Sequence, residues 1–460
     1  MPEPSSASTE GQADGPPFPV APGVLDVLET LWSAGHAAFL VGGGVRDALL
    51  GLKVLDWDVA TDARPERLLQ IFPGSSYQNR FGTVLAQGHE ITTFRRDHRY
   101  ADHRRPDAVT FSSDVFEDLA RRDLTINAIA WGRRGLGESA QLVDPADGQK
   151  DLEAQLVRAV GDPDRRFDED ALRLLRAVRI AARLGFRIEP ATWAAIVAHA
   201  DDLRWVSEER VGDEIRRMLS AAHPSRALRL MHEAGLLKTP LPELEALPPS
   251  AQARSLATLD AAAEVAPGQE HLALAGLLLE VGPEAARAAL ERLRVGGRDI
   301  DAVAVLTEAA AVPVAPDASD ADVRRFMARV PRELRDELLI LRSARARALK
   351  EDDRSAEARE LELRGRVMAQ RDASSPLTLA DLAIDGTDVR ETLGVPEGPI
   401  IGAVLRQLLA EVIEDPALNS RSTLLTRAGL VLDEIMQRGL DAQGSNPDGP
   451  PARPSGRLAP

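Results

Sequence analysis

Two neighbouring stretches decide the fold: residues 42–51 read GGGVRDALLG, and residues 55–63 read LDWDVATDA. A short apolar run at 37–41 precedes the glycines and predicts a strand. Residues 45–50 predict a helix after the glycines, and residues 55–60 predict a second strand. The order strand, glycine turn, helix, strand predicts a mixed α/β domain around these residues.

Two acidic residues lie in the second of these predicted strands, where Asp56 and Asp58 flank Trp57. Because side chains alternate along a strand, both carboxylates point to one face and Trp57 to the other. Adjacent carboxylates repel each other unless a cation lies between them, and Mg²⁺ prefers such oxygen ligands. We predict Asp56 and Asp58 as catalytic metal ligands for a two-Mg²⁺ site, with Glu90 as a further catalytic carboxylate. A role in a hairpin end or a helix cap is the alternative for an isolated Asp-x-Asp.

The glycines at 42–44 allow backbone N–H groups to approach a phosphate, and the following helix start favours negative charge. We therefore predict nucleotide contacts from Gly42, Gly43, Arg46 and Asp47. No Lys-Ser/Thr follows, so this is not a Walker A loop, and the third spaced glycine of a dinucleotide fingerprint is missing. A simple tight turn is the alternative.

Further elements extend from this centre. Apolar spacing predicts a helix over 24–34 that Gly35 closes, and a helix over 64–71. Residues 89–94 and 109–111 predict strands. From about residue 152 the pattern is nearly continuous helix, with breaks near 240–249, 311–320 and 372–376.

The composition favours a multidomain protein from a reducing compartment. The 460 residues exceed what one hydrophobic core organises, and there is no cysteine. No apolar stretch near the N-terminus is long enough to span a bilayer, so we expect a cytoplasmic protein without a membrane partner. Residues 1–19 and 441–460 are rich in Pro, Gly, Ser and Asp and predict disordered tails.

A net charge of −16 argues against indiscriminate binding to nucleic acid. The arginines are nevertheless clustered, and any one cluster alone is explained by a solvated helix face. Beside the acidic and glycine motifs, the clusters become candidate phosphate and RNA contacts; they are Arg95, Arg96, Arg99, Arg104 and Arg105; Arg121 and Arg122; and Arg173, Arg176, Arg179 and Arg183.

The ordered motifs resemble the class II CCA-adding tRNA nucleotidyltransferase and bacterial poly(A) polymerase family. Residues 42–63 resemble its catalytic head, and residues 94–106 resemble its flexible loop. Residues 121–127 (RRDLTIN) resemble its ribose and triphosphate motif, which implies nucleotide contacts from Arg122, Asp123 and Asn127. Further similar segments are the springy linker at 144–151, the nucleotide-selecting motif at 169–173 and the last neck motif at 208–214.

The nucleotide-selecting motif also has a direct chemical interpretation. Asp170 and Arg173 lie three residues apart on a predicted helix and share a face. A carboxylate accepts from an exocyclic amine and a guanidinium donates to a ring acceptor, so the pair can admit cytosine and adenine. An ordinary surface ion pair is the alternative. We add Arg176 and Arg179, on the same predicted helix, to the nucleotide-binding set.

The predicted fold is α+β, with a small mixed-sheet nucleotidyltransferase head followed by an all-helical neck, body and tail. Where some relatives carry a metal-dependent His-Asp phosphohydrolase pair, residues 271–282 place Leu279 and Glu280, so we expect packing there. Residues 376–402 resemble a C-terminal tRNA-binding arm. The predicted domains are a tail at 1–19, head 20–143, neck 144–220, body 221–372, arm 373–440 and a tail at 441–460.

The leading hypothesis is a nucleotidyltransferase that adds CCA, or its terminal part, to tRNA 3′ ends from CTP and ATP. An A-only enzyme, either A-adding or a poly(A) polymerase, is the alternative. The resemblance disfavours CC-only addition, because CC-only relatives tend to lack the flexible loop and here the loop from Arg95 to Arg105 is uninterrupted. A third hypothesis is an RNA-binding protein with a catalytically silent head. The sequence gives no indication of the oligomeric state.

Overall fold

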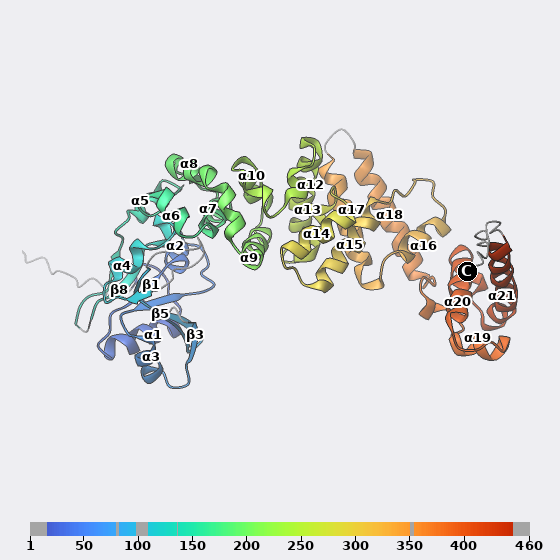
Figure 1. The fold of residues 1–460 in the computed structure, drawn as a ribbon, viewed down its shortest axis with the longest axis horizontal. Coiled ribbons are helices and arrows are strands. Elements are labelled where there is room, and N and C mark those ends of the chain that lie inside the picture. The colour runs from blue at the N-terminus through green and yellow to red at the C-terminus, as the bar shows by residue number, and fades with distance from the viewer. Residues whose placement is uncertain (1–15, 80–81, 98–108, 136, 350–353, 445–460) are drawn as a thin grey trace, which may run out of the picture. The chain divides into compact units, whose positions relative to one another are not determined.

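The computed structural model describes residues 16–79, 82–97, 109–135, 137–349 and 354–444 (Figure 1). The chain forms two compact units, Met1–Asp301 and Ala302–Pro460. Their boundary lies within the segment assigned above to the body, and the finer division into head, neck, body and arm stays a prediction. The large sheet belongs to the N-terminal part of the chain and helices follow it, which confirms the α+β fold class.

A seven-stranded mixed sheet forms the first part of unit one, in the strand order β3-β4-β5-β2-β1-β8-β9. The strands β2 and β5 are parallel neighbours, whereas β1 is antiparallel to both β2 and β8. A separate antiparallel ribbon pairs β6 with β7. The bounds are β1 Ala38–Val41, β2 Asp58–Thr61, β3 Ser76–Asn79, β4 Thr83–Ala86, β5 His89–Thr93, β6 Arg95–Asp97, β7 Val109–Phe111, β8 Ala130–Arg133 and β9 Gln141–Val143.

Short helices flank this sheet and complete its core. Phe39 and Phe94 are fully buried in a cluster that includes Val115 and Leu119 of α4. On α1, the residues Val24, Leu28 and others at helical spacing are also buried, as the apolar pattern predicts. The helices are α1 Pro22–Ser33, α2 Gly43–Leu49, α3 Pro65–Ile71, α4 Val115–Ala120 and the 3₁₀ helix η1 Thr125–Asn127.

The predicted strand at 55–60 is partly wrong, because β2 begins only at Asp58. Its register explains the difference: Val41, the last residue of β1, pairs with Asp58, so residues 55–57 have no partner in β1. The side chains nevertheless alternate in direction here, since Trp57 is buried and both Asp56 and Asp58 are exposed. The two carboxylates therefore point away from the tryptophan as predicted, although Asp56 precedes the strand.

The glycine turn is also shorter than predicted, because α2 already begins at Gly43. Gly42 alone forms the turn, with a φ of 75°. At Gly44 there is no room for a side chain, because a Cβ atom there would lie 2.9 Å from the carbonyl oxygen of Asp56 and 3.0 Å from the Trp57 ring. The third glycine thus lets α2 pack directly on the segment that carries the two aspartates.

Two assignments to disordered tails are corrected at their inner ends. Phe18 is buried and stacks on Trp57 with ring centroids 6.0 Å apart. It also meets the edge of Trp131, so Phe18 itself belongs to the core beside the sheet. At the other end, helix α21 (Arg421–Gly444) extends four residues past 440. Residues 1–15 and 445–460 of the two predicted tails lie outside the described chain.

Helices make up nearly all of unit one after the sheet, as predicted. Two two-residue strands, β10 and β11, pair in parallel between them and were not predicted. The elements are α5 Gly148–Glu153, β10 Leu156–Val157, α6 Pro163–Glu169, α7 Leu172–Leu184, β11 Arg187–Ile188, α8 Pro190–Ala198, α9 Glu208–Leu219, α10 Ser225–Glu233, α11 Pro242–Glu245, α12 Pro249–Val265, α13 Glu270–Leu278, α14 Pro283–Arg292 and α15 Gly297–Ala311.

The segment at 271–282 is a packing element, as expected. Residues 272–278 of α13 are all buried, and Leu279 is 5% exposed. Glu280 accepts from Arg254 of α12 at 2.6 Å, so it forms a structural ion pair.

Unit two is helical and has its own core between α19, α20 and α21, which includes Val389, Val404 and Leu424. Arg324 of α16 is buried and donates to the carbonyl oxygens of Ile413 and Glu414, which closes the C-terminal end of α20. The helices are α16 Asp320–Ala328, the 3₁₀ helix η4 Arg332–Leu334, α17 Arg335–Ala348, α18 Arg354–Asp372, the 3₁₀ helix η5 Leu379–Asp381, α19 Gly386–Leu393, α20 Pro399–Glu414 and α21. Within the described residues, no helix has the length and apolar character needed to cross a membrane.

Two of the helical glycines, Gly44 and Gly365, give opposite predictions. Gly365 of α18 has open space around it, so Gly365→Ala should raise the free energy of unfolding by about 0.5–1 kcal/mol. Gly44→Ala should lower it by roughly 1–3 kcal/mol, because the methyl group meets the backbone at Asp56. Urea unfolding of the two variants measures both effects, and equal stabilisation by both would contradict the packing described for α2.

Candidate active site

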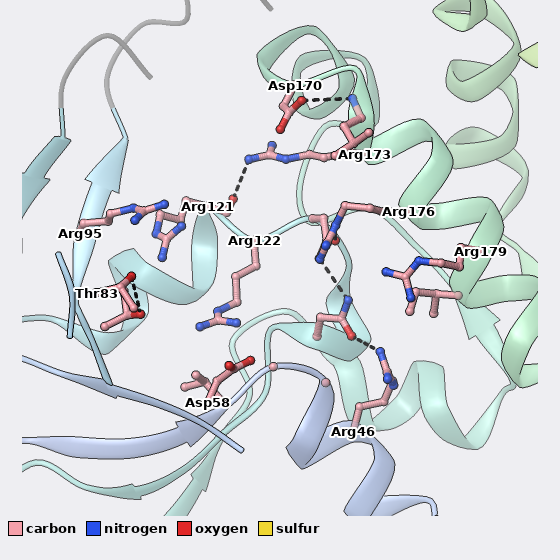
Figure 2. A pocket seen from close by; sticks show the side chains of 18 of the residues that line it. Arg46, Asp58, Thr83, Arg95, Arg121, Arg122, Asp170, Arg173, Arg176 and Arg179 are labelled. Atoms are coloured by element: carbon pink, nitrogen blue, oxygen red, sulfur yellow. Dashed lines mark hydrogen bonds and ion pairs between the residues drawn. The ribbon is translucent and has the colours of Figure 1, made fainter. Parts of the chain in front are cut away.

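A cavity of about 630 Å³ lies in unit one, between the inner strands β1, β2, β4 and β5 of the large sheet and helix α7 (Figure 2). Nine arginines and three aspartates line it, so this surface is strongly positive although the whole chain is acidic. Its charged lining is Arg46, Arg95, Arg121, Arg122, Arg173, Arg176, Arg179, Arg183, Arg210, Asp58, Asp123 and Asp170. An anion with several charged groups, such as a triphosphate, fits this lining best.

Carboxylates gather at the sheet end of the cavity. In the parallel pair β2 and β5, Val59 faces Ile91, so the preceding residues Asp58 and Glu90 are cross-strand neighbours. Asp58 lines the cavity, whereas Asp56 and Glu90 are not part of its wall. Among the described residues, no three His, Asp or Glu side chains are close enough to form a ready metal-ligand group. The three-carboxylate site therefore stays a prediction.

Two carboxyl groups at this end of the cavity, Asp58 and Glu90, have raised pKa values. Burial raises the pKa of Asp58, and nearby Asp56 raises it further, while Arg122 opposes the shift. Burial also raises the pKa of Glu90, with further contributions from Asp58 and Asp56. The negative charge at this position is thus incompletely compensated by protein groups, which is the electrostatic condition that a bound divalent cation relieves.

Gly42 and Arg122 make the closest approach to Asp58. A Cβ atom on Gly42 would lie 3.0 Å from Nη1 of Arg122 and 3.4 Å from Oδ2 of Asp58. Arg122 donates through Nη2 to Asp118 at 3.1 Å, and its buried Nε has no hydrogen-bond partner in the described chain. Arg121 donates to the same carboxylate at 2.6 Å. Asp118 therefore anchors two adjacent arginines at the cavity.

A continuous chain of charged hydrogen bonds ties the head to α7, and we call it the head–neck relay. It begins where Arg183 of α7 donates to Asp47 of α2 at 2.6 Å. Asp47 also accepts from Nε of Arg46 at 2.8 Å. The Nη1 atom of Arg46 then donates to Oδ1 of Asn127 in η1 at 2.6 Å. Both Arg46 and Asp47 are buried, so little water competes for these bonds.

The relay returns to α7 through Asp123. Asn127 donates from Nδ2 to Oδ1 of Asp123 at 3.1 Å, and Arg176 of α7 donates to Oδ2 at 2.6 Å. Burial alone would raise the pKa of Asp123, but Arg176 and the hydrogen bond from Asn127 outweigh it and hold that pKa well below its usual range. The carboxylate is therefore permanently charged and fixed in orientation.

Arg46 and Asp47, both predicted as nucleotide contacts, are members of the relay. Arg46 lines the cavity, but Asp47 and Asn127 already hold its guanidinium. Asp47 is not in the cavity wall, and its partners Arg46 and Arg183 are. The structure thus places Asp47 behind the wall, where it positions two arginines.

The predicted pairing of Asp170 with Arg173 on one helix face is wrong. Asp170 lies before α7 in extended conformation, where its Oδ1 accepts from the backbone N–H of Leu172 at 3.1 Å. Its Oδ2 accepts from Arg210 at 2.7 Å. The carboxyl caps the start of α7 because its short side chain turns back on the following backbone. Both Asp170 and Arg173 nevertheless line the cavity (Figure 2).

Arg173 is held by neighbours other than Asp170. It donates from Nη1 to Glu169 at 2.7 Å and from Nη2 to the carbonyl oxygen of Arg121 at 3.2 Å. Six residues further along α7, Arg179 donates to the buried Glu214 of α9 at 2.6 Å. The ion pairs fix the direction in which α7 presents its arginines.

Other cavity residues were not predicted as nucleotide contacts. Arg183 was named above only among the arginine clusters, and Arg210 lies within the neck motif at 208–214. Ion pairs with Asp47 and Asp170, which are distant in sequence, bring the two arginines to the cavity. Thr83 and Thr92 also line the cavity and are 3.3 Å apart through their hydroxyl oxygens. No sequence signal indicated Thr83, because β4 itself was not predicted. Most of the predicted flexible loop, residues 98–106, lies outside the described residues.

The family comparisons agree with the motifs. A family model described as the Poly A polymerase head domain matches residues 38–158, and one described as a probable RNA and SrmB- binding site of polymerase A matches residues 185–247. The CCA-adding enzyme of Geobacillus thermodenitrificans is 35% identical over 421 residues, which cover 89% of this chain and 96% of that relative.

Solved structures show the same fold. The crystal structure of the Bacillus stearothermophilus CCA-adding enzyme in complex with CTP matches with a TM-score of 0.70 at 28% identity, over 93% of this chain and all of that one. A Thermotoga maritima CCA-adding enzyme complexed with tRNA-CCA matches with a TM-score of 0.61 at 21% identity, over 90% and 96% of the two chains. The predicted family is confirmed: this chain belongs to the CCA-adding enzyme family of nucleotidyltransferases.

Proposed function

We propose that this protein adds CCA, or its terminal part, to the 3′ ends of tRNA, with CTP and ATP as nucleotide donors. The observation that carries the proposal is the alignment of 89% of the chain with 96% of a CCA-adding enzyme at 35% identity. The cavity supports it, because its nine arginines suit a nucleoside triphosphate and an RNA end. We also propose a cytoplasmic location, where these three substrates occur together.

Asp56 and Asp58 are the residues that we propose to hold Mg²⁺, with Glu90 beside them. The fit rests on the donor chemistry: three carboxylates supply oxygen ligands, and burial together with their mutual repulsion raises the pKa values of Asp58 and Glu90. When bound, two such ions supply charge stabilisation to both the attacking and the leaving oxygen of an in-line displacement. Asp58 lies in the cavity wall and is therefore the central residue of this set.

The surrounding residues orient the reactants of the transfer. The 3′-hydroxyl oxygen of the RNA attacks the α-phosphorus while its proton passes to solvent, the bond from that phosphorus to the bridging oxygen breaks, and pyrophosphate leaves with its electron pair. We assign the triphosphate to Arg122 and to Arg176 and Arg179 of α7, which neutralise charge developing on the leaving group. Asp123 and Asn127 form a rigid hydrogen-bonding wall for the sugar. The relay keeps both in place.

Base selection is assigned to Asp170 and Arg173. Each oxygen of Asp170 retains a lone pair beyond its bonds to Leu172 and Arg210, so it can still accept from an exocyclic amine. Glu169 and Arg210 hold the two side chains, so the edge that they present is preorganised for cytosine and adenine.

The assay that tests the proposal offers CTP and ATP, separately and together with Mg²⁺, to tRNA ending before CCA and to tRNA ending in CC. Addition of two C and then one A supports a complete CCA-adding enzyme. Addition of A alone to the CC end identifies the A-only alternative. No incorporation in any arm would refute the transferase proposal and leave the RNA-binding hypothesis.

Substitution of Asp58 tests the carboxylate assignment. Asp58→Ala should lower the rate of incorporation by at least about a thousandfold, because a metal ligand in the cavity wall is lost. Binding of tRNA should remain measurable in a filter assay. The matched control is Asp26→Asn, an exposed acidic residue on α1 that should leave the rate unchanged. Normal turnover of Asp58→Ala would contradict the assignment.

The raised pKa of Asp58 also predicts a dependence of stability on pH. A carboxyl whose pKa is higher in the folded than in the unfolded state binds its proton more tightly when folded. The contribution of Asp58 to the free energy of unfolding therefore falls as pH rises from about 4 through the raised pKa. Asp58→Asn should stabilise the metal-free protein at pH 8 by less than about 1 kcal/mol, since the carboxylate remains in contact with solvent.

Thermal unfolding in EDTA at pH 8 and near pH 4 checks this. The stabilisation by Asp58→Asn should disappear at the lower pH, and Mg²⁺ should stabilise the wild-type protein more than the variant. A variant less stable than wild type at pH 8 in EDTA would show that the charge of Asp58 is compensated by protein groups.

A further inference from the structure

A second cavity, of about 430 Å³, lies entirely within the unit Ala302–Pro460. Its wall is formed by the start of α17, the C-terminal end of α18 and the 3₁₀ helix η5. Three arginines line it together with hydroxyl and apolar side chains. The residues that matter are Arg332, Arg335, Arg371, Asp336, Asp381 and Ser374.

Arg335 carries a charge that the protein compensates poorly. Its Nε donates to the carbonyl oxygens of Met327 and Val330, at 3.1 and 3.2 Å. Its Nη2 is buried and has no hydrogen-bond partner among the residues that the structure describes. Burial lowers the pKa of Arg335, and nearby Arg332 lowers it further, against an opposing effect of Asp381. A buried guanidinium with an unused N–H group is costly unless an acceptor reaches it.

The two aspartates of the wall are already engaged. Asp336 accepts from Arg371 at 3.1 Å. Asp381 caps its own turn, where Oδ2 accepts from the backbone N–H groups of Leu377 and Thr378 at 3.0 and 2.8 Å. The cavity wall thus carries three arginines against two aspartates, a surplus of one positive charge. Arg332 lies in η4 and Arg335 is the first residue of α17, at the positive end of the helix dipole, where an anion is favoured.

We propose that this cavity is an anion site for a phosphoryl group, contacted by Arg335 and Arg332. A phosphoryl group in the cavity can accept from the guanidinium groups of Arg332 and Arg335 that line it, and its charge relieves the repulsion between the two arginines. The exposed hydroxyl of Ser374, at the end of α18, adds a donor at the rim. The group can come from free phosphate or from the backbone of an RNA, and the test distinguishes the two. The inference does not depend on the function proposed for unit one.

Hydrogen–deuterium exchange of the full-length protein gives the local readout, since phosphate also binds the arginines of the first cavity. Inorganic phosphate should slow exchange in peptides from residues 327–337 and 371–381. Arg335→Met should raise the phosphate concentration that gives half of this protection by about tenfold or more. Substitution of the exposed Arg332 in Arg332→Gln should raise it about threefold. Arg364→Gln, an exposed arginine on α18 outside the cavity, is the matched control and should behave as wild type.

A parallel arm replaces phosphate with tRNA. Protection of the same peptides by tRNA but not by phosphate, lost in Arg332→Gln, supports the site and assigns it to an RNA phosphodiester. Protection by phosphate alone supports the site and assigns it to a free anion. The proposal is overturned if neither ligand protects these peptides, or if both arginine variants are protected as wild type. Arg332→Gln keeps the test valid if Arg335→Met fails to fold.

Discussion

The active cavity depends on the buried carboxylate of Asp123, which receives Arg176 from one side and Asn127 from the other. A buried carboxylate is costly unless each oxygen is matched by a donor, and here both oxygens are. Because Arg176 belongs to α7 and Asn127 to η1, this one group fixes α7 against η1. Arg46, Asp47 and Arg183 close the same connection from the opposite end.

The connection also separates two kinds of charge within a small volume. Carboxylates at the ends of β2 and β5 repel one another and favour a cation, whereas α7 and its neighbours present arginines to an anion. A nucleoside triphosphate with its metal ions satisfies both needs together. The acidic surface elsewhere leaves this cavity as a local positive region, so charge directs phosphate to it without general affinity for nucleic acid.

The sequence predicted the components better than their connections. The positions of Asp58, Gly42 and the helix after it followed from glycine conformation and strand alternation, which are local properties. Asp170 was misassigned because a capping aspartate and a helical aspartate have the same spacing to Arg173, and only the backbone distinguishes them. The role of Asp47 depends on Arg183, 136 residues away, and Thr83 depends on a strand whose neighbours are set by the whole sheet. Spacing along the chain carries no information on such contacts.

The most direct test of this account is a double-mutant cycle on Asp47 and Arg183, because Asp47 supports the cavity without lining it. Steady-state kinetics with CTP and ATP would compare Asp47→Asn, Arg183→Gln and the double variant, with the exposed Asp213→Asn as control. We expect the KM values for CTP and for ATP to rise about tenfold in each single variant and little further in the double variant. The ratio of the KM for CTP to the KM for ATP should not change. Unchanged KM values in Asp47→Asn, or fully additive effects, would contradict a cavity positioned by the relay.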